Sequence, residues 1–337
     1  MPESPLWPLI LIIVLAFGFG MVNGWNDAAN AIATVIGTRV LSPRKAVILA
    51  AFFNFAGAAT GLEVARTIGK GILVPEAITN QTVIAALAAI IIWGALATYR
   101  GLPISLHHGF IAGLAAAGMA VAGSDAVVWG VMRRIIAAVG IAPLLGFVGG
   151  FGLMVILLWS FRRAAPAKVR KISSNLQILS SAFIAYSHGK NDGQMPIAVI
   201  TMGLVIYYQR TDIWNQLPFG DLWWVVVVSA FAISLGTAIG GWRVIRTLGL
   251  RVTTLRPVHG FAAQASAASI IEIASHLGIP VSTTHCITAS IMGVGATKRF
   301  SAVRWGIAGN IVAAWILTFP ICGALGYLFA WLLKPVF

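Results

Sequence analysis

Long apolar stretches dominate the 337-residue chain, and short polar segments separate them. A helix needs about 20 apolar residues to cross the hydrocarbon core of a membrane. Runs that approach or exceed this length lie at residues 6–20, 83–97, 135–159, 222–239 and 305–333. The segments between them are too short for a large soluble domain. The pattern therefore predicts an all-α polytopic membrane protein.

A polar motif occurs twice within these apolar stretches. Residues 24–27 read Gly-Trp-Asn-Asp, and residues 189–192 read Gly-Lys-Asn-Asp, 165 positions later. The residue types of Pro103, Ser105 and His108 also recur, in each case 177 positions later. Self-similarity over such a distance indicates an internal duplication. We predict a first membrane repeat over residues 1–161, a basic cytoplasmic linker over 162–171, and a second membrane repeat over 172–337.

The basic residues indicate how the repeats sit in the membrane. Lys and Arg gather in short clusters at residues 39–45, 162–171, 243–256 and 298–304. This is the positive-inside pattern of cytoplasmic loops. We therefore assign the formal net charge of +14 to topology rather than to nucleic-acid binding.

Each repeat is then expected to cross the membrane five times. The odd number gives the two repeats opposite orientations and places both chain termini outside. The expected crossings are residues 6–38, 46–66, 80–98, 103–121 and 135–161, followed by 173–208, 222–242, 258–277, 281–296 and 303–333. The segments 103–121 and 281–296 are short, so each is either a span or a re-entrant helical hairpin.

Inverted repeats with broken helices are typical of secondary transporters, whose binding site lies where the halves meet. We predict helix breaks at Asn23-Gly24 and at His188-Gly189, because each pair interrupts a long apolar run. Pro103 and Pro280 are each expected to open a short helix, since proline is tolerated in a first turn.

The residues that follow these prolines suit an anion. A helix N-terminus presents free N–H groups and the positive end of the helix dipole. Hydroxyl side chains add donors at the two expected N-termini, suited to a tetrahedral oxyanion: Ser105, Ser282, Thr283 and Thr284. The alternative is that these hydroxyls only cap their helices. Lys190 is expected to pair with Asp192 or with the anion, and no role is assigned to Glu272.

Asp27 and Asp192 place carboxylates at membrane depth, where an ionised group costs about 3 kcal/mol or more. We expect both to bind a coupling cation. With the amides of Asn26, Asn30 and Asn191, and with carbonyls freed at the helix breaks, they form an oxygen cage for Na⁺, or they accept H⁺. The alternative for each Asp is a helix N-cap.

The histidines and cysteines carry weaker signals. His107 is expected to contact the substrate or to respond to protons, because histidine titrates near neutral pH. His108 and His285 are either packing residues or supports of the site. Cys286 and Cys322 are predicted to be small buried hydrophobic residues rather than a disulfide or a metal site.

Four motifs resemble those of the inorganic phosphate transporter (PiT) family of secondary transporters. They stand in family order at residues 23–31, 187–194, 242–249 and 278–285. The resemblance implies a symporter that takes up inorganic phosphate across the bacterial cytoplasmic membrane with H⁺ or Na⁺, by alternating access. It also implies an inverted-repeat fold with helical hairpins, a homodimer, and no cofactor besides the coupling cation.

The chain departs from the family pattern in two respects. Leu106-His107 stands where the family usually has hydroxyl residues, so the first hairpin is expected to contact the anion differently from the second. Asn54 and Gln264 stand where sodium-coupled eukaryotic members tend to carry Glu, and we expect them to support the site. Because those carboxylates could distinguish protonated phosphate from sulfate, a sulfate permease of the same family is the alternative function.

Two other classes of protein explain the sequence less well. An intramembrane hydrolase needs a His-Glu-x-x-His arrangement or a Ser and His pair with a base. Neither arrangement occurs, so an enzyme is not expected. A channel would conduct without coupling, so its flux would persist without the carboxylates of Asp27 and Asp192.

Overall fold

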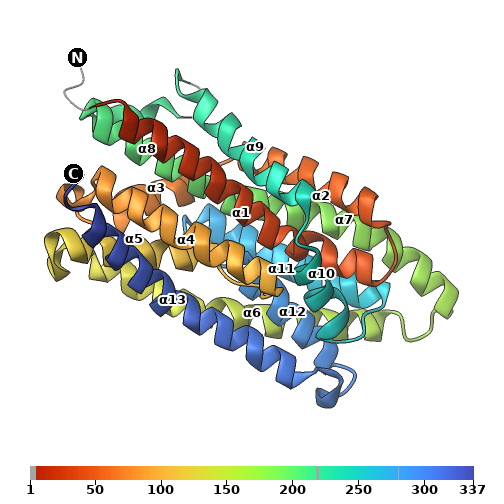
Figure 1. The fold of residues 1–337 in the computed structure, drawn as a ribbon. Coiled ribbons are helices and arrows are strands. Elements are labelled where there is room, and N and C mark those ends of the chain that lie inside the picture. Colours follow the sequence, from red (N-terminus) through yellow and green to blue (C-terminus); the bar gives the residue numbers. More distant parts are fainter. Residues whose placement is uncertain (1–4, 218–219, 280) are drawn as a thin grey trace.

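The computed structural model describes residues 5–217, 220–279 and 281–337. Within these residues, thirteen α-helices are joined by short 3-10 and π-helical turns, and no β-strand is present (Figure 1). The all-α class that the apolar runs predict is confirmed.

Each predicted crossing overlaps one helix or two consecutive helices. The first half contains α1 (Trp7–Gly37), α2 (Pro43–Ala58), α3 (Glu63–Gly71), α4 (Asn80–Arg100), α5 (Leu106–Ala122) and α6 (Trp129–Ser160). The second half contains α7 (Pro166–Asp192), α8 (Gln194–Tyr208), α9 (Trp223–Ile239), α10 (Trp242–Arg246) with a π-helical turn (Thr247–Arg251), α11 (Pro257–His276), α12 (Thr283–Ala296) and α13 (Trp305–Leu333).

Of the described helices, α1, α4, α6 and α13 are long and apolar enough to cross a membrane. Two bent pairs raise the number to six: α2 with α3, bent by 68°, and α9 with α10 and the π-helical turn, bent by 60°. The 17 residues of α5 and the 14 of α12 extend only about 25 Å and 21 Å at about 1.5 Å per residue. Both are shorter than a hydrocarbon core of about 30 Å. The chain is an integral membrane protein, and these lengths favour the re-entrant alternative for α5 and α12.

Helix packing is matched between the two halves. α5 packs on α13 as α12 packs on α6, and α1 packs on α9 as α7 packs on α2. Each helix of one half thus has a partner from the other half, and α2 and α9 also pack against each other. This pairing agrees with a duplication, while the inverted orientation of the repeats stays a prediction.

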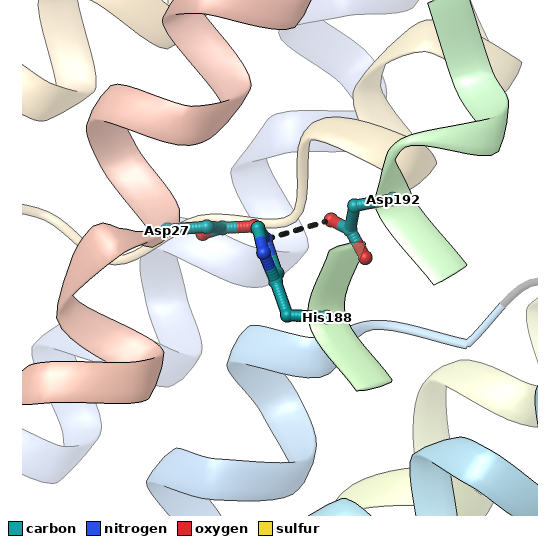
Figure 2. Close-up of side chains that lie close together, drawn as sticks. All are labelled: Asp27, His188 and Asp192. Atoms are coloured by element: carbon teal, nitrogen blue, oxygen red, sulfur yellow. Dashed lines mark ion pairs between the residues drawn. The ribbon is translucent and has the colours of Figure 1, made fainter. Parts of the chain in front are cut away.

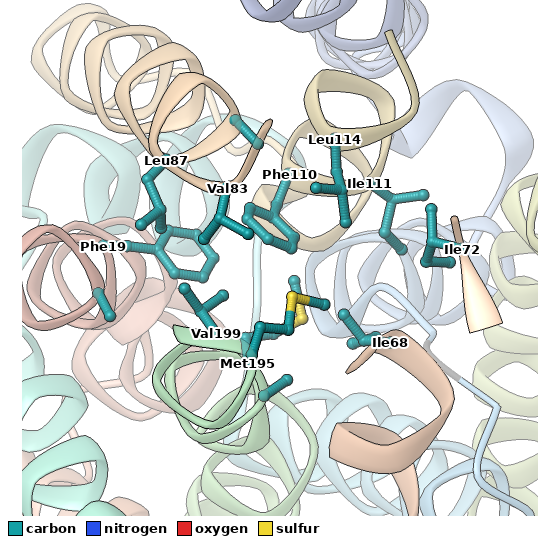
Figure 3. Close-up of a cluster of buried hydrophobic side chains, with 14 of the residues drawn as sticks. Phe19, Ile68, Ile72, Val83, Leu87, Phe110, Ile111, Leu114, Met195 and Val199 are labelled. Carbon is teal, nitrogen blue, oxygen red and sulfur yellow. The ribbon is translucent and has the colours of Figure 1, made fainter. Parts of the chain in front are cut away.

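Two apolar clusters flank the polar positions of α1. The first cluster contains Phe19 of α1 and Phe110 of α5, whose stacked rings lie 5.6 Å apart, and it includes residues of α3, α4 and α8 (Figure 3). The second cluster contains Ile32 of α1 together with Ile184 and Ile287. The buried polar residues Asn23, Asn26 and Asp27 of α1 lie between the two clusters along the helix.

The predicted helix breaks at Asn23-Gly24 and His188-Gly189 are wrong, because α1 and α7 run through these positions without interruption. Both glycines instead allow close helix packing. A Cβ atom on Gly24 would lie 2.0 Å from the carbonyl oxygen of Ile233, and one on Gly189 would lie 2.1 Å from that of Asn54. The polar sequence that suggested a break therefore marks a helix crossing.

The short helices also begin later than predicted. α5 begins at Leu106 with Ser105 as its N-cap, so Pro103 lies in the extended segment before the helix rather than in its first turn. α12 begins at Thr283 with Ser282 as its N-cap. Pro280, the other proline expected to open a helix, lies outside the described residues.

Candidate functional site

Two buried carboxylates approach each other in the middle of the bundle. Asp27 lies on α1, Asp192 is the last residue of α7, and His188 lies one turn before Asp192. One ligand atom from each of the three lies within 4.8 Å of the others. His188 Nε2 is 3.5 Å from Oδ2 of both carboxylates, and Figure 2 shows the imidazole between them. Two carboxylates buried this deeply need positive charge or protons beside them.

A side chain of α2 orients the imidazole of His188 by contacting the ring nitrogen that faces away from the carboxylates. Asn54 Oδ1 lies 2.7 Å from His188 Nδ1, and Asn54 Nδ2 donates to Thr237 Oγ1 at 2.9 Å. Because the Asn54 oxygen can only accept, Nδ1 of His188 donates the hydrogen bond. Nε2 is therefore the nitrogen that faces the carboxylates.

Asn23 occupies the matching position on α1, one turn before Asp27. With its amide oriented to satisfy its hydrogen bonds, Nδ2 donates to Oδ2 of Asp27 at 3.2 Å and of Asp192 at 3.3 Å. Asn23 and His188 are 165 positions apart, as are the two Asp residues. The halves thus supply the same geometry with a neutral amide on one side and a titratable ring on the other.

The start of α12 contacts the carboxylate of α1. Thr284 Oγ1 donates to Asp27 Oδ1 at 2.7 Å. Asn30 Nδ2 donates to the hydroxyls of Thr283 at 3.3 Å and Thr284 at 3.0 Å. The buried Oδ1 of Asn30 has no hydrogen-bond partner among the described residues. Residues expected to bind the anion therefore touch residues expected to bind the cation.

The start of α5 contacts the carboxylate of α7 in the matching way. His107 Nδ1 lies 3.4 Å from Asp192 Oδ2, and His107 stands 177 positions before Thr284. Both serines cap their helices: Ser105 Oγ accepts from His108 N at 3.3 Å, and Ser282 Oγ accepts from His285 N at 3.1 Å. Each short helix thus begins beside the carboxylate of the other half.

Asn26 and Asn191, both expected in the cation cage, hold the chain before the short helices through their amides. Asn26 Nδ2 donates to Leu102 O at 3.2 Å, and its Oδ1 accepts from Ile104 N at 3.4 Å. Asn191 Nδ2 donates to Val281 O at 2.9 Å and to Asp192 Oδ1 at 2.8 Å. Asn191 Oδ1 accepts from Ser275 Oγ at 3.3 Å. Because α1 is unbroken, no freed carbonyl joins the expected cage there.

Lys190 does not pair with Asp192, one of its two predicted partners. Its ammonium bonds to Glu272 of α11 and lies 3.2 Å from His276 Nε2. Lys190 and Asp192 are two residues apart on one helix, and such residues do not face each other. The partner of Lys190 is thus the carboxylate to which the sequence assigned no role.

The remaining predicted residues lie around this centre. The rings of His108 and His285 are 5.1 Å apart; the His108 ring stacks on Phe319, and the His285 ring lies tilted 4.0 Å from that of Trp315, so both pack among aromatic side chains. Gln264 donates to Ala31 O at 2.9 Å and is a support of α1 rather than a contact of the carboxylates. Cys286 and Cys322 are buried and unpaired, as predicted.

Sequence reasoning missed His188 and Asn23 as site residues. Both belong to the residue pairs that the sequence predicts as helix breaks. The signal that could have found them is their spacing, because each precedes an Asp by four residues and so lies on the same helix face.

Apolar spanning helices around a buried charged centre define an integral membrane protein of the transporter class. The chain belongs to the phosphate transporter family, whose sequence profile matches residues 23–326. The resemblance to that family is confirmed, and its members are transporters rather than enzymes.

Two relatives are described as probable low-affinity inorganic phosphate transporters. The relative from Rhizobium meliloti (strain 1021) is 42% identical over 97% of this chain and 97% of its own length. The relative from Bacillus subtilis (strain 168) is 41% identical over 97% of this chain and 98% of its own. A solved structure described as the sodium-dependent phosphate transporter is similar with a TM-score of 0.90 and 25% identity, and the match covers 98% of this chain and 100% of that one.

Proposed function

We propose that the chain takes up inorganic phosphate across the bacterial cytoplasmic membrane in symport with a cation, by alternating access. The descriptions of its relatives support phosphate as the substrate. The expected substrate contacts are the first turns of α5 and α12, with Ser105, His107, Ser282, Thr283 and Thr284. Lys190 is left out of this set because its ammonium is already bound to Glu272.

The observation that carries this proposal is the hydrogen bond from Thr284 to Asp27. Thr284 lies in the first helical turn of α12, where backbone N–H groups attract an anion. Asp27 repels an anion unless a cation or proton neutralises it. Because one hydroxyl connects the two, neutralising Asp27 frees that donor and removes the repulsion together. Cation binding and anion binding then favour each other.

Each candidate coupling ion has an observation in its favour. Na⁺ prefers oxygen ligands, and the unpaired Oδ1 of Asn30 adds one to the oxygens of Asp27 and Asp192. H⁺ is favoured by His107 and His188, whose ring nitrogens lie 3.4 and 3.5 Å from Asp192. The 25% identical structure is described as sodium-dependent, which favours Na⁺ for that protein.

Alternating access is supported by the matched packing of the halves. We propose that the repeats have inverted topology and that α5 and α12 are re-entrant. Each short helix follows a left-handed glycine, Gly101 with φ 73° and Gly278 with φ 65°. A homodimer is proposed from the family resemblance and is tested by the mass of the purified protein in detergent.

The proposal is tested with purified protein in liposomes. Labelled phosphate is supplied under an imposed Na⁺ gradient and, separately, under an imposed H⁺ gradient, and only the coupling ion should drive accumulation. Asp27→Asn and Asp192→Asn should abolish accumulation, whereas Glu76→Gln, which changes an exposed carboxylate, should not. Sulfate counterflow without phosphate counterflow would overturn the choice of substrate. Flux that persists in both Asn variants would indicate a channel.

A further inference from the structure

A part-buried ion pair lies beside the site and plays no part in the proposed chemistry. Lys190 of α7 is 6% exposed, and its ammonium bonds to Oε1 of Glu272 on α11. His276, one turn further along α11, lies 3.3 Å from the same oxygen. Ser187 donates to the other carboxylate oxygen at 3.3 Å. Losing Glu272 would leave the nearly buried ammonium of Lys190 without its carboxylate, so the pair links α7 to α11.

The pair belongs to a set of contacts that fix the chain between α11 and α12. Asn191, the residue after Lys190, donates to Val281 O at 2.9 Å. Thr67 of α3 donates to Gly278 O at 2.8 Å. Ser282 and Thr284 follow directly, so the position of this connection sets the position of the N-terminus of α12. Opening the site at this end requires the connection to separate from α7 and α3.

In the other half, an Asn and a Thr also donate to the chain before the short helix, but a different contact stands in place of the ion pair. Asn26 donates to Leu102 O at 3.2 Å, and Thr247 donates to Gly101 O at 3.0 Å. The positions that correspond to Lys190, Glu272 and His276 hold uncharged residues: Trp25, Ala95 and Tyr99. There, Arg243 donates to Tyr99 O, and its guanidinium lies 4.1 Å from the centre of the Tyr99 ring.

We propose that Lys190 and Glu272 form an ion-pair latch that keeps the site closed at the end where α11 stops, and that its release opens that end. Both halves use an Asn and a Thr donor before the short helix, whereas the positions of the ion pair hold charged residues in the second half alone. The latch therefore makes the two ends of the transport path different. It rests on the proposed transport function, since it names the residues that gate access to the same site.

The latch is tested by the reactivity of a cysteine beneath it. Val281, which is 6% exposed, is replaced by Cys in a Cys286→Ala, Cys322→Ala background, and the full chain is placed in nanodiscs without phosphate. A hydrophilic maleimide should react about tenfold faster when Glu272→Gln is added. Glu76→Gln, which changes an exposed carboxylate away from the connection, is the matched control and should leave the rate unchanged. An unchanged rate in Glu272→Gln would overturn the latch.

A second cysteine separates opening at one end from general loosening. Ile104 occupies the position that corresponds to Val281 and is fully buried. Glu272→Gln should leave the reaction of Ile104→Cys unchanged or slower, because closing one end accompanies opening the other. An equal increase at Ile104 would show loosening and contradict the proposal.

Charge reversal keeps the test decisive where a single variant folds poorly. Lys190→Glu with Glu272→Lys should restore slow labelling of Val281→Cys, because the pair is re-formed with its sign reversed. Lys190→Arg should also keep labelling slow. Fast labelling in the folded double variant would overturn the latch. Since labelling is measured without substrate, its outcome is independent of whether the liposome assay supports phosphate transport.

Discussion

At the scale of single residues, the two halves of the site are related by position but differ in chemistry. Asp27 and Asp192 match, whereas Asn23 corresponds to His188 and His107 corresponds to Thr284. Each carboxylate accepts contacts from a side chain of the opposite half. A substitution at the start of either short helix therefore changes the contacts of the carboxylate in the other repeat.

Replacing Thr284 with Val removes one hydroxyl and keeps the shape of the side chain. A hydrogen bond to a charged group contributes about 1.5–3 kcal/mol, so we expect coupled phosphate uptake to fall by about 10- to 100-fold. The initial rate of uptake by proteoliposomes measures this. Thr288→Val is the matched control, because Thr288 is buried one turn along α12 and its hydroxyl has no partner among the described residues. Equal losses in both variants would contradict a specific role of Thr284.

Part of the site could be predicted from the sequence, because duplication and buried charge are visible in the chain itself. These two features indicate four residues that lie together in the structure: Asp27, Asp192, Thr284 and His107. Their roles in transport stay predictions. The partner of Lys190 could not be predicted, because Glu272 lies 82 positions away on a different helix and only the packing of α7 on α11 brings them together.

At the scale of helices, the glycines of the polar motif explain why the predicted helix breaks are wrong. A Gly beside Asn usually marks a turn in water. In lipid, however, a helix satisfies its own backbone groups, and a small residue lets neighbouring helices approach closely. Gly24 packs on α9 and Gly189 packs on α2, which explains why α1 and α7 stay continuous.

Gly24→Ala and Gly189→Ala should therefore destabilise the protein. The added methyl groups would lie 2.0 Å and 2.1 Å from backbone oxygens, and such overpacking costs about 1–3 kcal/mol or more. We expect a lower unfolding temperature in detergent, measured by loss of the monodisperse peak after heating. Gly152→Ala on α6 is the control, since a Cβ there meets no atom within 4 Å. Destabilisation of the control to the same extent would contradict close packing as the cause.

At the scale of the whole molecule, the order of the helices was largely predictable because the apolar runs are long and the basic clusters separate them. The bends between α2 and α3 and between α9 and α10 were not predicted, although a left-handed glycine, Gly61 or Gly240, lies at each bend and charged residues follow it. The ring of Trp7 lies 5.2 Å from that of Phe337, so the two described ends of the chain meet at one end of the bundle. The linker between α6 and α7 lies at the opposite end (Figure 1).

This arrangement gives the last prediction, which concerns the predicted external termini and cytoplasmic linker. Single cysteines at Val336 and Ala165, both exposed, are introduced into the Cys286→Ala, Cys322→Ala background. In intact spheroplasts, an impermeant maleimide should label Val336→Cys at once and Ala165→Cys only after permeabilisation, because the positive-inside rule places the basic linker in the cytoplasm. The reverse order would contradict the predicted orientation but keep the two ends on opposite faces. Labelling of both from the same side would contradict the membrane placement itself, since the bundle separates these positions along its length.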